Sequence, residues 1–393
     1  MILLLILLAG AQSAGAQSEQ CGLCHPEERV EHSLSIHSQE YIQCSDCHGG
    51  RPDAIKEEQA HGGDFRSLQD RKQIPALCAG CHADPTQMRA YNLPTDQFAL
   101  YQTSGHGLAL AKGNESVAVC TDCHSTHTIL RSEDPNSPTF IRNISETCGQ
   151  CHGEGGVQAD ADAEKDVLQA YLGSVHAREL LEEGNTNAPE CSRCHGIHGA
   201  APAGVGDIGK MCGNCHSAAL RAFRDSPHAS AMVEAGLPEC LACHAHHETQ
   251  PSRYQQMAQA CLNCHAQGSD QHVVGEKMEV LFGRAEEELE HAREVIARAE
   301  RVPLYVEDYL ARLEEARTFL LEAEPAVHTV SLNDVDRFTS LSRSLAEEIE
   351  TEIDGELSDL RLRRLLLVVF WFYLLLTIWI LYHYRQKALK HRA

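Results

Sequence analysis

Eighteen cysteines fall without remainder into nine pairs, and this arrangement constrains the chain more than any other feature. Every pair is spaced C-x-x-C and is followed at once by a histidine, at residues 21–25, 44–48, 78–82, 120–124, 148–152, 191–195, 212–216, 240–244 and 261–265. C-x-x-C-H is the attachment signature of c-type haem, in which both thiols become thioethers on the porphyrin and the imidazole reaches the iron. The sequence therefore predicts nine covalently attached haem c groups.

Three other uses of paired cysteines fit the pattern less well. A disulfide framework or a redox dithiol would not require a histidine after every pair, and structural zinc would group the pairs or use H-x-x-x-H. The haem interpretation assigns two sets of residues. The thioether cysteines are Cys21, Cys24, Cys44, Cys47, Cys78, Cys81, Cys120, Cys123, Cys148, Cys151, Cys191, Cys194, Cys212, Cys215, Cys240, Cys243, Cys261 and Cys264. The proximal iron ligands are His25, His48, His82, His124, His152, His195, His216, His244 and His265.

The motifs belong to an internal repeat. Residues 105–127, 175–198 and 227–247 each begin with a histidine, continue through a predicted short helix and end in C-x-x-C-H-x-x-H. A second motif follows each stretch, at 148, 212 and 261. Residues 37–82 form a degenerate copy without the trailing histidine, for which His61 is a substitute, and the motif at 21–25 stands alone.

The second axial position of each iron decides between two functions. A strong-field ligand there gives a low-spin iron suited to passing electrons, whereas an open face permits substrate chemistry. Ten histidines outside the motifs lie within residues 21–270, which is enough for nine irons. The predicted distal ligands are His32, His37, His61, His106, His127, His176, His198, His228 and His247. His246 is interpreted as a neighbour of His247. His328 has two interpretations, a cap on one of the last haems or a solvent-exposed loop histidine, and the sequence favours the second.

His198 makes a more specific prediction. It follows the proximal His195 by three residues on the same strip of chain, so it cannot reach the opposite face of the same iron. If it is a ligand, it must bind a different haem packed close by. The segments CTDCHSTH and CLACHAHH support the same conclusion.

Both ends of the chain predict export and anchoring. Residues 1–16 combine a short apolar run with the cleavage-like Ala14-Gly15-Ala16 and are predicted to be a signal peptide. The apolar stretch 365–384 is long enough to span a bilayer, so residues 361–384 are the predicted anchor. The basic residues of 385–393 predict a cytoplasmic tail, although Arg361, Arg363 and Arg364 on the other flank weaken the asymmetry. The expected location is the cell membrane, single-pass, with the haem domain in the periplasm or extracytoplasmic space.

The predicted fold class is mostly α and irregular, with two parts before the anchor. The haem domain, residues 17–271, has so few large side chains that the porphyrins must supply most of its apolar core. Residues 272–360 carry three helical stripes, bounded by Pro303 and Pro325 and with Asn333 or Asp334 as a helix cap. We expect an antiparallel helical subdomain that is a spacer, a packing wall for the last haems or a surface for a homo-oligomer. The net charge of −23 argues against a nucleic-acid partner.

The chain resembles the multihaem cytochrome c superfamily, and specifically its members with doubled C-x-x-C-H motifs. The resemblance rests on those motifs and on the segments SIH (35–37), SGH (104–106), SVH (174–176) and SPH (226–228). It covers residues 21–265 and implies stacked haems with two histidine ligands each. It also implies electron transfer from a membrane quinol-oxidising or cytochrome b-type partner to a periplasmic or extracellular acceptor. Tetrahaem quinol dehydrogenases are anchored at the N-terminus, so their quinol site is not carried over.

The alternative function is a multihaem oxidoreductase acting on nitrite, hydroxylamine or tetrathionate. Several such enzymes replace the proximal histidine of the active haem with lysine, and none of the nine motifs does so. An open-faced iron would then be expected at the solitary first motif or at the irregular second. The sequence favours an electron carrier without catalytic residues of its own.

Overall fold

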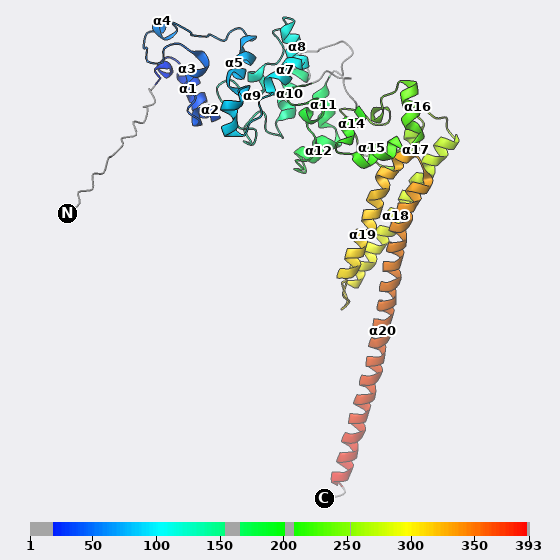
Figure 1. The fold of residues 1–393 in the computed structure, drawn as a ribbon. Coiled ribbons are helices and arrows are strands. Elements are labelled where there is room, and N and C mark those ends of the chain that lie inside the picture. The colour runs from blue at the N-terminus through cyan, green and yellow to red at the C-terminus, as the bar shows by residue number, and fades with distance from the viewer. Residues whose placement is uncertain (1–18, 154–165, 201–207, 252, 391–393) are drawn as a thin grey trace, which may run out of the picture. The chain divides into compact units, whose positions relative to one another are not determined.

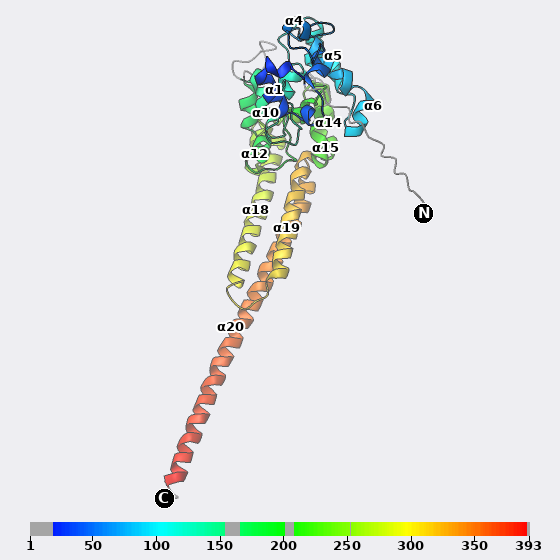
Figure 2. The same cartoon turned by 90° about the vertical axis from the view of Figure 1, so that its left-hand side faces the viewer.

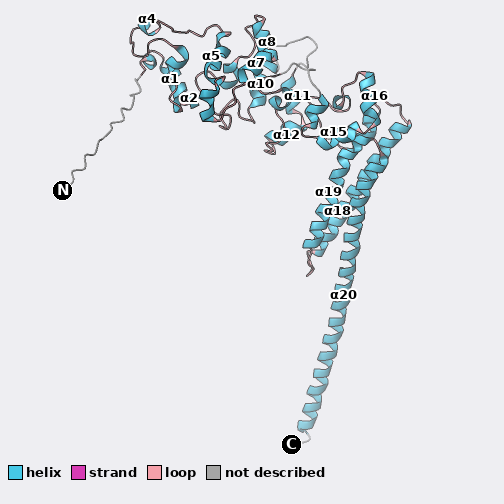
Figure 3. Ribbon diagram, in the orientation of Figure 1, coloured by secondary structure: helices cyan, strands magenta, loops and turns pink. Residues whose placement is uncertain are grey.

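The computed structural model describes residues 19–153, 166–200, 208–251 and 253–390, so the predicted signal peptide lies outside the described residues. Within these ranges the chain forms helices and loops and no strand (Figure 3). The contacts divide it into two compact units. Unit 1 comprises Met1–Gly206 and Ala245–Pro251, and unit 2 comprises Asp207–His244 and Ser252–Ala393. The predicted helical class is confirmed.

Unit 1 is built from short helices that follow one another in chain order (Figure 1). Its helices are η1 (Cys21–Leu23), α1 (Pro26–Ser33), α2 (Ile36–Gln39), α3 (Cys44–His48), α4 (Glu57–Ala60), α5 (Gln73–His82), α6 (Pro85–Met88), η2 (Arg89–Tyr91), α7 (Gln97–Thr103), α8 (Gly105–Ala111), α9 (Cys120–His124), α10 (Ile144–His152), α11 (Val167–Leu172), α12 (Val175–Leu181) and α13 (Cys191–His195). Among its described residues, the buried apolar side chains are Met88, Leu110, Val119, Tyr171, Ala177, Leu180 and Ala188. So small a core does not stabilise a unit of this length by itself.

Unit 2 has short helices followed by long ones. They are α14 (Ile208–Gly213), α15 (Ser217–Arg224), α16 (Pro227–Ala235), η3 (Cys240–Ala242), η4 (Tyr254–Gln256), α17 (Met257–Cys261), α18 (Asp270–Ala299), α19 (Glu307–Ala326), η5 (Val327–Thr329) and α20 (Leu332–Lys390). Figures 1 and 2 both show α18 and α19 running alongside the first part of α20, which continues beyond them. The predicted helical subdomain therefore corresponds to α18, α19 and the first part of α20.

The three long helices enclose two apolar clusters. One is centred on Ile296, Leu313 and Ile349, and the other on Met278, Phe282 and Val335. Tyr254 and Met257, which lie just before the last haem motif, pack against the second cluster. Of the three roles left open by the sequence, the contacts of unit 2 support a packing wall for the end of the haem region.

One helix, α20, replaces the separate third helix and anchor expected from the sequence. It begins at Leu332, and the Ser331 hydroxyl accepts the Asp334 N–H at 3.4 Å, so Ser331 is the cap and the predicted Asn333 or Asp334 is not. Its segment Leu332–Lys387 is long and apolar enough to cross a membrane. The large apolar side chains between Leu365 and Tyr384 are nearly all exposed, which water does not favour.

Candidate haem-binding sites

Acidic side chains begin several of the motif helices. The Asp46 carboxylate accepts the Gln43 N–H at 2.7 Å ahead of α3, and Asp122 accepts the Val119 N–H at 2.6 Å ahead of α9. Glu190 accepts the Ser192 N–H at 2.6 Å at the start of α13. A carboxylate here satisfies N–H groups that the first turn leaves without partners. It thereby holds both cysteines and the histidine of the motif on one short helix.

The serines of the S-x-H segments are helix caps. Ser104 illustrates this, because its hydroxyl accepts the Gly107 N–H at 3.0 Å and donates to the Tyr101 carbonyl at 2.7 Å. The four capping serines are buried and lie two residues before a predicted distal histidine; they are Ser35, Ser104, Ser174 and Ser226. The cap fixes the first turn of the helix and hence the direction of the histidine on it.

Three of the four leading histidines face the second motif of their own repeat. The ring centres of His37 and His82 are 5.9 Å apart. The distance is 6.0 Å for His106 and His152, and 6.1 Å for His228 and His265. In the repeat that begins at residue 175, the corresponding residues are His176 on α12 and His216, which belong to different units.

Each trailing histidine faces the first motif of the repeat before its own. The ring centres are 6.4 Å apart for His127 and His48, 6.2 Å for His198 and His124, and 6.0 Å for His247 and His195. His198 thus lies opposite a histidine that is not its neighbour in the sequence. This is the geometry that its spacing from His195 requires.

A backbone hydrogen bond lies close to each of these three trailing-histidine pairs. The N–H group that follows a capping serine donates to the carbonyl two residues beyond a trailing histidine. The three bonds are Ile36 to Ile129 at 2.8 Å, Gly105 to Ala200 at 2.9 Å and Val175 to Thr249 at 2.8 Å. In three places, therefore, the same backbone hydrogen bond joins the capped helix of one repeat to the segment that follows the trailing histidine of the next repeat.

Two further pairs end the series. His61 faces His25 of the solitary first motif at 6.1 Å, and its ring also stacks on Phe65. His328, at the junction of α19 and α20, faces His244 at 6.2 Å and is half-buried. The expectation of a solvent-exposed loop histidine at 328 was wrong, because η5 turns that ring into unit 2.

The separation of these eight pairs matches two imidazoles on one metal ion. An imidazole–metal bond of about 2 Å and about 1.1 Å from nitrogen to ring centre, taken on both sides, give about 6.2 Å. The eight ring-centre distances lie between 5.9 and 6.4 Å. Direct ring stacking would bring the centres closer, as it does for His61 and Phe65 at 4.2 Å. The pairs therefore fit an iron between them.

Second hydrogen bonds select the ring nitrogen that faces the gap. The Nδ1–H of His48 donates to the Arg66 carbonyl at 3.1 Å, and that of His328 donates to the Pro325 carbonyl at 3.2 Å. Nδ1 of His127 lies 3.3 Å from a Glu31 carboxylate oxygen. Because a carbonyl only accepts, Nδ1 of His48 and of His328 carries the proton and Nε2 keeps its lone pair for a metal.

Burial keeps many of these rings neutral. Desolvation is the main cause that lowers the pKa of His37, His82, His106, His124, His198, His228 and His328. Metal binding needs the neutral imidazole, because a protonated ring has no lone pair to give. The environment therefore favours the protonation state of a ligand.

Two histidines named in the sequence analysis have other positions. His32 lies on α1 near His37, and after burial and His82 it is the third cause that lowers the pKa of His37. No contact of its ring with a motif histidine is found among the described residues. His246 lies edge-on to His247, with the two Nδ1 atoms 2.9 Å apart.

The cysteines place consecutive motifs next to each other. Within each unit the first thiols of two successive motifs adjoin, in the pairs Cys21 and Cys44, Cys78 and Cys120, Cys148 and Cys191, and Cys212 and Cys240. The second thiol of the later motif then lies near the motif that follows. Burial, and after it the neighbouring thiols, raise the pKa of Cys47, Cys123 and Cys243, beside Cys78, Cys148 and Cys264 respectively. Within each unit the attachment points therefore follow the chain order.

Comparison with known protein families gives two matches. Residues 36–87 match the doubled CXXCH motif family, and residues 211–283 match the family of cytochrome c554 and c-prime. Searches of curated proteins and of solved structures give no match.

Proposed function

Since the chain is a multihaem c-type cytochrome, whose families serve electron transfer and bind haem covalently, we propose that it carries nine haems and relays electrons along them. We assign each haem to one C-x-x-C-H motif. The distal ligands are His61, His37, His127, His106, His198, His247, His228 and His328, facing His25, His82, His48, His152, His124, His195, His265 and His244.

The observation that carries this proposal is the series of eight histidine pairs at iron-like separation. Each haem supplies an iron that takes up and releases one electron. The residues of the chain fix the position of each haem, since two thioethers and a histidine from one segment and a distal histidine from another hold it. Two strong-field ligands favour a low-spin iron, which suits electron transfer.

The two irons that the enzyme alternative would leave open both face a histidine. His61 lies opposite the first motif and His127 opposite the second. No observation on the described residues favours an open-faced iron, so the electron carrier is the function we propose.

For the physiological role, we infer that α20 anchors the chain and that the haem region lies on the periplasmic side. The donor is then a membrane quinol-oxidising or cytochrome b-type protein, and the acceptor a periplasmic or extracellular redox protein, as in anaerobic respiration. The exposed apolar part of α20 supports the anchor. The net charge of −23 supports a redox partner with a basic surface.

The test is a redox titration of the full chain followed by low-temperature electron paramagnetic resonance. We expect at least eight low-spin irons per chain, one for each facing pair of histidines. We also expect a quinol to reduce the haems in native membranes, where the membrane partner is present, and not when that partner is absent. A high-spin ferric signal in the wild type, together with turnover of nitrite or hydroxylamine, would replace the relay by the oxidoreductase.

A further inference from the structure

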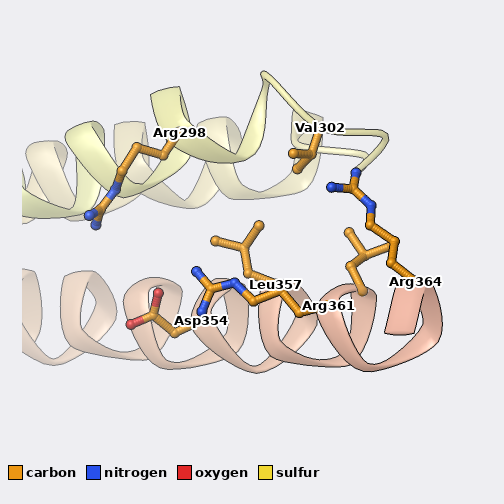
Figure 4. A pocket seen from close by; sticks show the side chains of 7 residues that line it. Arg298, Val302, Asp354, Leu357, Arg361 and Arg364 are labelled. Carbon is orange, nitrogen blue, oxygen red and sulfur yellow. The ribbon is translucent and has the colours of Figure 1, made fainter. Parts of the chain in front are cut away.

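A cavity lies where α18 ends against α20, far along the bundle from the haem motifs. It has a volume of about 230 Å³ and is lined by Arg298, Val302, Asp354, Leu357, Leu360, Arg361 and Arg364. Figure 4 shows the arginines of both helices around it. On α20 the lining residues recur at intervals of three and four, so they share the face that α18 covers.

The arginines of this cavity have no protein partner. Within the part of the chain that the structure describes, the side chains of Arg298, Arg361 and Arg364 form no ion pair and no hydrogen bond. Two other arginines on the same helices are paired, Arg293 with Glu290 at 2.8 Å and Arg343 with Glu347 at 3.3 Å. Three arginines against one aspartate leave the cavity with two positive charges, in a chain whose net charge is −23.

The ordinary explanations cover only part of this cluster. Arg298 lies in the last turn of α18, where the helix dipole favours a cation. Arg361 and Arg364 lie in the middle of α20 and gain nothing from a helix end. Nor does the topology signal explain them, since cations on the exported flank oppose it. A bound anion accounts for all three.

The position of the cavity indicates the source of that anion. Arg364 directly precedes the exposed apolar segment that starts at Leu365. The loop after α18 carries Tyr305, which is 70% exposed, and tyrosine is enriched at the membrane–water interface. The three guanidinium groups therefore lie at the level where lipid phosphates lie.

We propose that this cavity binds the phosphate of an anionic phospholipid headgroup in the outer leaflet. The forked guanidinium groups of Arg298, Arg361 and Arg364 match phosphate oxygens, and the acyl chains follow the exposed apolar face of α20. The surplus of positive charge selects a headgroup with net negative charge over a zwitterionic one. The inference rests on the proposed function in one respect, that α20 crosses the membrane with the haem region outside.

The test uses the full chain reconstituted in nanodiscs of phosphatidylcholine with phosphatidylglycerol. After extraction into detergent and washing, the phospholipid retained per chain is measured by mass spectrometry. We expect the wild type to retain phosphatidylglycerol preferentially. Each of R298Q, R361Q and R364Q should weaken its retention about fivefold, and the triple variant should abolish the preference.

The matched control is the triple variant R284Q/R293Q/R317Q, which removes the same charge from the bundle surface. Arg284 lies about 21 Å along α18 from Arg298, from fourteen residues at about 1.5 Å each. This control should retain the lipid as the wild type does. Equal loss in both triple variants, or equal retention of both lipids by the wild type, would overturn the proposal. So would displacement of the lipid by millimolar inorganic phosphate, which would indicate a site for the free anion.

Two parallel measurements separate this inference from the proposed function. Haem content and the number of low-spin irons report on the relay, and resistance of the chain to alkaline extraction from membranes reports on the anchor. An anchored, fully haem-loaded protein without lipid preference refutes the lipid site alone. Release from the membrane at alkaline pH overturns both the anchor and the lipid site.

Discussion

Replacing His328 by alanine should open one haem and leave the others unchanged. The His328 ring is the described group that faces His244 across 6.2 Å, and the Pro325 carbonyl orients it. Alanine leaves the space of an imidazole beside the iron, which water enters as a weaker ligand. With nine motifs per chain, we expect about one ninth of the ferric iron to become high-spin.

The assay is electron paramagnetic resonance integrated against total haem iron, with two rescue experiments. Added imidazole should fill the space and restore the low-spin signal. The His328→Met variant should stay low-spin, because methionine also ligates haem iron, and the midpoint potential of that one haem should rise. Neither rescue is expected if His328 only stabilises the bundle.

The control is His291→Ala in the same unit. His291 lies on α18, is exposed and pairs with Glu350 at 2.9 Å, so its loss should leave the number of low-spin irons unchanged. The same number of low-spin irons in the His328→Ala variant as in the wild type would refute the reasoning from ring separation. A high-spin iron in both variants would show that the effect comes from a loosened bundle.

Three further changes have expected results. Ser104→Ala removes the cap of the helix that carries His106, so the urea midpoint of unfolding should fall by an amount equivalent to about 1 kcal/mol. One haem should also lose its distal ligand more readily. Ser104→Thr keeps a hydroxyl cap and should preserve both the urea midpoint and the ligation. Ile353→Ala in the fully buried core of the bundle should cost about 2–5 kcal/mol in thermal unfolding of the bundle without changing the haem spectrum. Arg312→Ala breaks two ion pairs with exposed glutamates on α20 and should cost about 0.5–1 kcal/mol, an effect that disappears at high salt.

The repeat could be predicted from the sequence because its information is local. The spacing of C-x-x-C-H fixes a haem at each motif, and the three-residue offset of His198 from His195 excludes a shared iron. The identity of the other iron is not local. It depends on contacts between repeats, such as the backbone hydrogen bond from Gly105 to Ala200. The sequence of either repeat alone does not predict that bond.

For His328 the sequence favoured the exposed loop over a haem cap, because its surroundings in the sequence are those of a helical bundle. A signal was nevertheless present in the repeat. If every trailing histidine serves the repeat before its own, His247 serves His195 and the last repeat has no successor to serve His244. A histidine beyond the last motif is then required, and 328 is one of the few that remain.

The continuity of α20 was missed for a different reason. The change from an amphipathic stripe to an unbroken apolar stretch near residue 361 marks a change of surroundings. Hydropathy reports which solvent a helix faces, whereas only backbone-breaking residues or caps report where it ends. The intervening residues contain no proline, so the helix continues from the bundle into the apolar segment.

The haem repeats and the helical bundle differ in how far their stability depends on haem. Unit 1 has few buried apolar side chains, and each repeat is joined to the next by a backbone hydrogen bond and a histidine pair. We therefore expect unit 1 to be largely unfolded without haem, as metal-organised domains are. The bundle of unit 2 has apolar clusters of its own and needs no haem for its core. His328 lies at the junction of α19 and α20 and faces His244, so the last position in the series of ligands is attached to a core that does not depend on haem. An end fixed in this way gives the haem-dependent repeats a folded support on which ligation can begin.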